Sequence, residues 1–162
     1  MSLTVQVEPA RGATPRVAYR WDTDTDILSA QLEDRAPDGP SATVELQGHD
    51  GSWVILDVRA GRIRGIEVAV WPDVRKRPAL TPPPAEPGDV VLPPRHSGGS
   101  SAIDSPLSAE VDEPERIFHF RLGSSAESRA VEIASGMLVD VEPTGAVAGI
   151  WLLNVPPFPL DQ

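Results

Sequence analysis

Short runs in which apolar and polar residues alternate recur along the chain, and this period of two predicts β-strands. In the run 52–58, Val54, Leu56 and Val58 fall on one face of an extended strand. No window keeps a 3.6-residue period over the length of a helix, so the pattern predicts an all-β protein. The strands expected in the first part of the chain are 17–21, 27–32, 52–58 and 66–70.

One pattern occurs twice along the chain. Ile55-Leu56-Asp57-Val58 is followed by a short turn and Gly61-Arg62-Ile63-Arg64-Gly65-Ile66. Leu138-Val139-Asp140-Val141 is followed in the same way by Gly145-Ala146-Val147-Ala148-Gly149-Ile150. Both read apolar, apolar, Asp, Val, turn, Gly-x-apolar-x-Gly-Ile. We therefore predict an internal duplication, with Asp57 equivalent to Asp140 and Gly65 equivalent to Gly149.

The duplication divides the chain into a first β repeat at 15–72, a Pro/Gly/Ser-rich linker at 73–105 and a second β repeat at 106–157. Proline lacks a backbone donor and has a fixed φ, so we expect the linker to stay out of the sheet. The run Ser97-Gly98-Gly99-Ser100-Ser101 is typical of a flexible segment. The linker is therefore expected to act as a passive tether.

Each repeat is expected to form a four-stranded meander. A unit of this size buries only about 60% of the surface that its unfolded chain exposes, and it is marginal alone. We therefore expect that neither repeat folds by itself. The two should pack face to face or pair edge to edge around a pseudo-twofold axis, as a sandwich or a fused dimer.

Composition narrows the functional classes. The formal net charge of -10 opposes binding to nucleic acids, and it suits either simple solubility or a basic protein partner. The absence of cysteine excludes disulfides, thiolate zinc sites and cysteine nucleophiles. The first twelve residues have no apolar signal region, and no stretch approaches the roughly 18 apolar residues of a membrane span. We therefore expect a cytoplasmic protein with no membrane contact.

The first repeat resembles a known bacterial family. Tyr19-x-x-Asp22-x-x-x-Asp26-x-Leu28, a Val-x-Leu/Ile-Asp strand, a Gly turn and Ile63-x-Gly65-Ile66-Glu67 are similar to the domain of unknown function 2283 family. The family has no established activity, and some members resemble antitoxin-like partners of small basic toxins. The resemblance thus implies a fold and a basic protein partner. The second repeat departs from the pattern, since Ala109, Arg116 and Trp151 replace Tyr19, Asp26 and Glu67.

Asp57 and Asp140 are the most informative polar residues, because each interrupts an apolar strand. A carboxylate there must face water or accept hydrogen bonds. One hypothesis is an outward-facing side chain that bonds to the adjacent glycine turn. The other is a pair of carboxylates related by the pseudo-twofold axis, close enough for one pKa to be raised, which would give an acid/base site.

Two other sets of residues are candidates for binding. Asp22, Asp24 and Asp26 resemble part of a calcium loop, but Ile27 stands where such a loop needs glycine, so an acidic hairpin turn is favoured. Trp71 and Trp151 lie at the ends of the two repeats, where they either pack between the repeats or form an exposed aromatic contact. The spacing of the three histidines, His49, His96 and His119, gathers no metal ligands, and no cofactor motif is present.

The sequence favours a non-enzymatic binding or protein-interaction module. The alternative is a small-molecule-binding or hydrolytic protein that uses a cleft between the repeats with Asp57 and Asp140. A filled interface between the repeats would favour the first interpretation, and a buried cleft lined by both aspartates would favour the second.

Overall fold

The computed structural model describes residues 3–96, 98–123 and 127–158, and it is nearly all β. The alternating patterns above account for most of its strands, because successive side chains of a strand point to opposite faces. The strands are β1 (Gln6–Pro9), β2 (Val17–Asp22), β3 (Ile27–Leu32), β4 (Ser41–Gln47), β5 (Trp53–Arg59), β6 (Arg62–Val70), β7 (Val74–Lys76), β8 (Ala85–Val91), β9 (Gly99–Asp104), β10 (Leu107–Asp112), β11 (Ile117–Leu122), β12 (Arg129–Ala134), β13 (Met137–Val141) and β14 (Val147–Leu152). A single 3₁₀ turn, η1, spans Pro94–His96 among the described residues.

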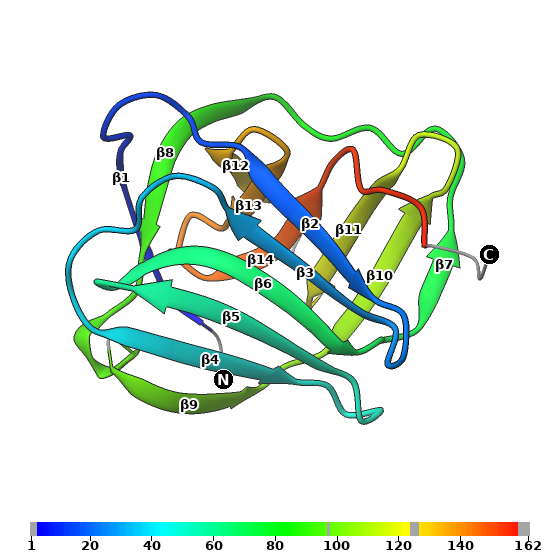
Figure 1. Cartoon of the computed structure of the whole chain (residues 1–162), viewed down its shortest axis with the longest axis horizontal. Helices are drawn as coiled ribbons and strands as arrows, with labels where there is room; N and C mark the ends of the chain where they lie inside the picture. The colour runs from blue at the N-terminus through cyan, green and yellow to red at the C-terminus, as the bar shows by residue number, and fades with distance from the viewer. Residues whose placement is uncertain (1–2, 97, 124–126, 159–162) are drawn as a thin grey trace.

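The strands form one curled mixed sheet (Figure 1). Strands β2 to β6, here called the first group, lie in the order β2-β3-β6-β5-β4. Strands β10 to β14, the second group, lie in the order β10-β11-β14-β13-β12. In each group the aspartate pairs with the second glycine of the pattern, Asp57 with Gly65 and Asp140 with Gly149. The two groups therefore share strand order and register at this pair.

The expected four-stranded meander is wrong in both strand number and order. Each group has five strands, because 41–47 and 129–134 also form strands. The fifth strand of each group pairs with the second, β6 with β3 and β14 with β11. The third strand, β4 or β12, therefore lies at the edge of its group. The alternation of Ala42, Val44 and Leu46 is the signal for the additional strand in the first group, and all three are buried.

The expectation that the proline-rich segment stays out of the sheet is also wrong. Strand β7 pairs with β10, β8 pairs with β12 and β1, and β9 pairs with β4, so the linker runs around the molecule as part of the sheet (Figure 1). Strand β8 tolerates Pro87 because β12 pairs with Ala85–Pro87, whereas β1 pairs from Gly88 onward. A proline fits where one edge of a strand is unpaired.

Both groups contribute to one apolar core on the inner face of the curled sheet. Leu56 and Ile66 from the first group join Val139 and Ile150 from the second, and all are almost completely buried. Because side chains alternate along a strand, Asp57 and Asp140 face away from this core.

A smaller apolar cluster covers the outer face of the second group. Leu80, from the proline-rich segment, packs there with Ala130, Leu138 and Trp151. The segment 77–84 between β7 and β8, which contains Leu80, is called the strap below. The corresponding outer positions of the first group, such as Ile55 and Glu67, are only half-buried. The two outer faces therefore differ: one is closed by the chain itself and the other is open.

Candidate functional site

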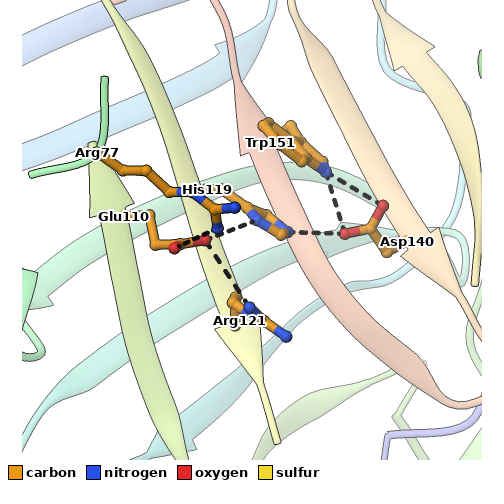
Figure 2. Close-up of polar contacts among 6 residues, drawn as sticks. All are labelled: Arg77, Glu110, His119, Arg121, Asp140 and Trp151. Carbon is orange, nitrogen blue, oxygen red and sulfur yellow. Dashed lines mark hydrogen bonds and ion pairs between the residues drawn. The ribbon is translucent and has the colours of Figure 1, made fainter. Parts of the chain in front are cut away.

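A polar network lies on the outer face of the second group (Figure 2). One of its members, Trp151, packs against Leu80 of the strap. Asp140 on β13 is 5% exposed, and its Oδ2 lies 2.9 Å from Nε2 of His119 on β11. Nε1 of Trp151 on β14 donates to both carboxylate oxygens of Asp140, at 3.1 and 3.2 Å. The rings of His119 and Trp151 stack with their centroids 3.8 Å apart and an interplanar angle of 9°. The carboxylate is thus fixed from two sides.

Gly149 makes this contact sterically feasible. Strand β14 separates β11 from β13, and Gly149 pairs with Asp140. A Cβ at position 149 would lie 2.9 Å from both Oδ2 of Asp140 and Nε2 of His119. The missing side chain leaves the notch in which the imidazole and the carboxylate meet across the intervening strand. This close packing explains why the second glycine of the pattern, Gly149, could not carry a side chain without displacing its neighbours.

The other ring nitrogen of His119 also faces a carboxylate. Nδ1 lies 3.8 Å from Oε1 of Glu110, and the same oxygen lies 3.8 Å from Nη1 of Arg121 (Figure 2). The other oxygen of Glu110, Oε2, accepts a hydrogen bond from Nη1 of Arg77 at 2.8 Å. Burial raises the pKa of Glu110, but the hydrogen bond from Arg77 and the charges of Arg77, Arg121 and His119 outweigh it, so the pKa is lowered. Both ring nitrogens of His119 therefore face carboxylates: Nε2 lies within hydrogen-bond distance of Asp140, and Nδ1 lies 3.8 Å from Glu110.

The equivalent position in the first group has different neighbours. Nε2 of Gln31 donates to Oδ2 of Asp57 at 2.5 Å, and a Cβ on Gly65 would lie 2.5 Å from Oε1 of Gln31. Glu67 replaces the tryptophan, and burial, followed by the negative charge of Asp57, raises the pKa of Glu67. Asp57 also lines a cavity of about 370 Å³. The carboxylate whose pKa responds to the charge of Asp57 is therefore Glu67 of the same group, and not Asp140.

Asp57 and Asp140 are not brought together in the structure. Asp57 binds Gln31 of its own group, and Asp140 binds His119 and Trp151 of the other. Each points outward from a different part of the curled sheet, and Asp140 is not among the residues that line the Asp57 cavity. Their hydrogen bonds go to side chains across a glycine, whereas the sequence suggested a bond to the neighbouring turn.

The acidic turn forms a compact hairpin end beside a tryptophan. Oδ1 of Asp22 accepts from the backbone N–H of Asp24 at 2.9 Å, and Asp26 has a φ of 61°. Nε1 of Trp71 donates to the backbone carbonyl of Asp26 at 2.8 Å. Side-chain capping of this kind is typical of aspartate-rich turns and leaves Asp24 and Asp26 exposed to solvent.

More acidic and apolar side chains gather at the same end of the molecule. Trp53 pairs with Val70 at the ends of β5 and β6, and both are exposed, at 37% and 46%. Hydrogen bonds from the hydroxyl and the backbone N–H of Ser52 lower the pKa of Asp50, and the backbone N–H of Asp73 adds to this effect. The turn that contains Asp50 therefore lies beside Asp73. We call this surface the acidic end; it comprises Asp24, Asp26, Asp50, Asp73, Trp53, Val70 and Val74.

Of the two tryptophans singled out from the sequence, neither is an exposed contact. Trp151 is buried, and Trp71 is half-buried against Trp21, Phe118 and Phe120, which places it between the two groups. The exposed tryptophan is Trp53, which sequence reasoning missed. The available signal was the alternation of the strand: Val54 faces the core, so the preceding residue, Trp53, faces the opposite side.

The histidines lie in three separate places. His49 is exposed in the β4–β5 turn, whereas His96 is buried with Nδ1 2.8 Å from Oγ of Ser101. Burial, and then the charge of Arg95, lowers the pKa of His96. In the part of the chain that the structure describes, no three potential metal ligands are grouped together. Within the same residues, no helix has the length and apolar character needed to cross a membrane.

No protein-family model matches the chain, and no curated protein matches it either. The resemblance of the first repeat to a bacterial family therefore stays a prediction.

Proposed function

We propose that the protein is a non-enzymatic interaction module that binds a basic protein partner at the acidic end. One observation carries this proposal: the space between the two groups is filled by a single apolar core. A filled interface leaves no shared cleft in which Asp57 and Asp140 would act together. The polar contacts of His119 also stay inside the second group, because both ring nitrogens have carboxylate neighbours there.

The proposal includes an internal duplication, in which the two groups are copies of one five-stranded unit packed as a pseudo-twofold pair. Their common strand order and the repeated aspartate–glycine pair support it. In such a fused pair each copy covers the inner face of the other, which a single unit of this size could not do alone. The outer faces and turns are then free to diverge, as the open and closed faces have done.

The chemistry of the acidic end favours a basic partner. Exposed tryptophan and valine side chains offer apolar area, and aromatic residues are prominent among the side chains that dominate binding energy at interfaces. Carboxylates around such a patch attract a positively charged surface and exclude acidic ones. The net charge of -10 acts over a longer range and raises the association rate with a basic protein at low salt. A small basic partner also agrees with the antitoxin-like role that the family resemblance implies.

The test is affinity capture from lysate of the native host, with three baits compared by quantitative mass spectrometry. The baits are the natural protein, a variant with Asp24→Asn, Asp26→Asn and Asp50→Asn, and a control with Glu33→Gln, Asp38→Asn and Glu115→Gln. The two variants lose the same charge, but the control changes exposed carboxylates outside the acidic end.

We expect a basic protein that the natural bait and the control retain and the acidic-end variant loses. Retention of the same proteins by all three baits, or of no basic protein by the natural bait, would contradict the proposal.

A further inference from the structure

The sheet opens where the first group meets β8. Strands β6 and β8 pair at a single position, Arg62 with Val91, and beyond it β6 pairs with β3 while β8 pairs with β12. A hollow of about 180 Å³ is lined by residues from both sides of this opening and by the β1–β2 loop, residues 10–16. The start of β6 lines the hollow, whereas the acidic end lies at the other end of the same strand. The two regions are therefore separate.

Arginines gather around this hollow although the protein is acidic. Arg11, Arg35, Arg62 and Arg64 all line it, whereas the whole chain has 14 lysine and arginine residues and a net charge of -10. On β6, Arg62 and Arg64 alternate with the buried Ile63, so both point away from the core. The hollow thus concentrates positive side chains that the overall composition does not predict.

Two of the arginines are held by carboxylates of the protein. Nη2 of Arg62 lies 2.8 Å from Oε1 of Glu8, and its Nε lies 3.2 Å from Oδ2 of Asp89. Arg64 binds Asp34 through Nη2 alone. Its Nε and Nη1 have no hydrogen-bond partner among the described residues, and neither is a buried atom. Arg62 is therefore a fixed part of the wall, whereas Arg64 keeps two donors that solvent can reach.

The other two arginines have no such carboxylate. Arg11 in the β1–β2 loop and Arg35 in the β3–β4 loop are exposed, and neither forms an ion pair with any described residue. Glu132 is the one lining carboxylate that is likewise unpaired within the described ranges. Because Arg11 and Arg35 are not held elsewhere, both guanidinium groups can turn toward an anion in the hollow.

The β1–β2 loop adds backbone donors and is anchored at both ends. Pro9, just before the loop, pairs with Gly88 of β8, and the carbonyl of Pro15 accepts a hydrogen bond from the backbone N–H of Ser135 at 2.7 Å. Between these anchors, the backbone N–H groups of residues 11–14 donate to no backbone carbonyl of the described chain. Successive backbone N–H groups in a turn can form an anion-binding concavity.

These donors suit a dianion better than a single carboxylate. One guanidinium is enough to bind a carboxylate through two hydrogen bonds, whereas a phosphate monoester has three acceptor oxygens and a charge of about -1.5 to -2 at neutral pH. The hollow is smaller than the roughly 300 to 1,000 Å³ of pockets for drug-sized ligands, so only a small organic group fits beside the phosphate. Leu32 and Pro37 provide an apolar wall for that group.

We propose that this hollow binds a small phosphate monoester, with the phosphate between Arg11 and Arg35 and against the backbone N–H groups of the β1–β2 loop. The carbon skeleton lies along Leu32 and Pro37. Because the site is at the opposite end of β6 from the acidic end, it is tested without the basic protein partner.

The experiment is a ¹⁵N–¹H NMR titration of the intact protein at constant ionic strength and about pH 7.5, since the second pKa of a phosphate monoester is near 6. The esters are glycerol 3-phosphate, ribose 5-phosphate and O-phosphoserine, and the comparison anions are inorganic phosphate and succinate. We expect at least one ester to shift the backbone amides of 11–14 and 35–36. It should bind about tenfold or more tightly than succinate, because one further hydrogen bond between charged groups contributes that much.

Four variants complete the test. Arg11→Gln and Arg35→Gln should each weaken ester binding about tenfold, and neither removes an ion pair of the folded protein. Glu132→Gln should tighten binding about twofold or more, because it removes a negative charge from the lining. Arg75→Gln, the matched control at an exposed arginine on β7, should change nothing.

The proposal is overturned if no ester shifts these amides in the natural protein, if succinate binds as tightly as the best ester, or if both arginine variants keep the natural affinity. Inorganic phosphate that binds at least as tightly as every ester would assign the hollow to the free anion and would also overturn the proposal. The titration of the natural protein stands even if a variant fails to fold.

Discussion

Leu80→Ala tests whether the strap stabilises the fold. Leu80 is 7% exposed and packs on Ala130, Leu138 and Trp151, while its backbone N–H donates to Oδ2 of Asp112 at 3.1 Å. Alanine keeps the backbone hydrogen bond and removes the apolar contacts. Truncation of a buried leucine costs about 2 to 5 kcal/mol. Because this cluster is small and lies at the outer surface, we expect the lower part of that range, about 2 to 3 kcal/mol.

The assay is urea unfolding followed by tryptophan fluorescence, with an unchanged slope showing that the unfolded state is comparable. In a chain of this length the loss corresponds to a fall in Tm of about 4 to 12 °C. The matched control is Thr81→Ala, an exposed neighbour, which should stay within about 0.5 kcal/mol of the natural protein. If Leu80→Ala also changed stability by less than about 0.5 kcal/mol, the strap would be a passive tether and the reasoning would fail.

Two further predictions concern the polar residues. Gly149→Ala should destabilise the protein by about 1 to 3 kcal/mol, because its Cβ would meet Asp140 and His119 at 2.9 Å, whereas Gly98→Ala, with open space around it, should be nearly neutral. Equal effects of the two in urea unfolding would contradict the notch described for Gly149. The pKa of Glu67 is raised in the folded state, so the folded protein binds the proton more tightly and stability falls as the pH rises through that range. Glu67→Gln should therefore be more stable than the natural protein at neutral pH, with no gain below about pH 4; a gain that is independent of pH would refute this assignment.

The sequence predicted which segments form strands more reliably than it predicted which strands lie side by side. Alternation in 27–32 and 52–58 reports directly which side chains are buried, and those strands are present. Strand order depends on contacts between distant segments, which a local pattern does not contain. The fifth strand of each group therefore returned beside the second without a sequence signal.

The proline-rich segment shows how tertiary context can override a local rule. Proline excludes a residue from sheet positions that need a donor, but Pro87 lies at a switch between two partner strands. No sequence pattern indicates that Leu80 is buried, because it is a single apolar residue among prolines. Its burial depends on the outer face of a group that lies far along the chain.

The candidate sites were predicted as residues but not as arrangements. Asp57 and Asp140 are equivalent in register, yet their neighbours differ, because Glu67 lies beside Asp57 where Trp151 lies beside Asp140. The side chain of His119 on β11 meets Asp140 on β13 only because Gly149, on the strand between them, has no side chain. A pair of aspartates is visible in a sequence, whereas the histidine, glutamate and glutamine that bind or repel them come from other strands.

Hydrogen–deuterium exchange of the protein with its captured basic partner tests the central claim most directly. The account predicts that binding slows amide exchange at 22–26, 48–53 and 70–74, which carry the acidic end, and leaves the strap and β11–β14 unchanged. Protection confined to the second group, or spread evenly over the sheet, would contradict the account.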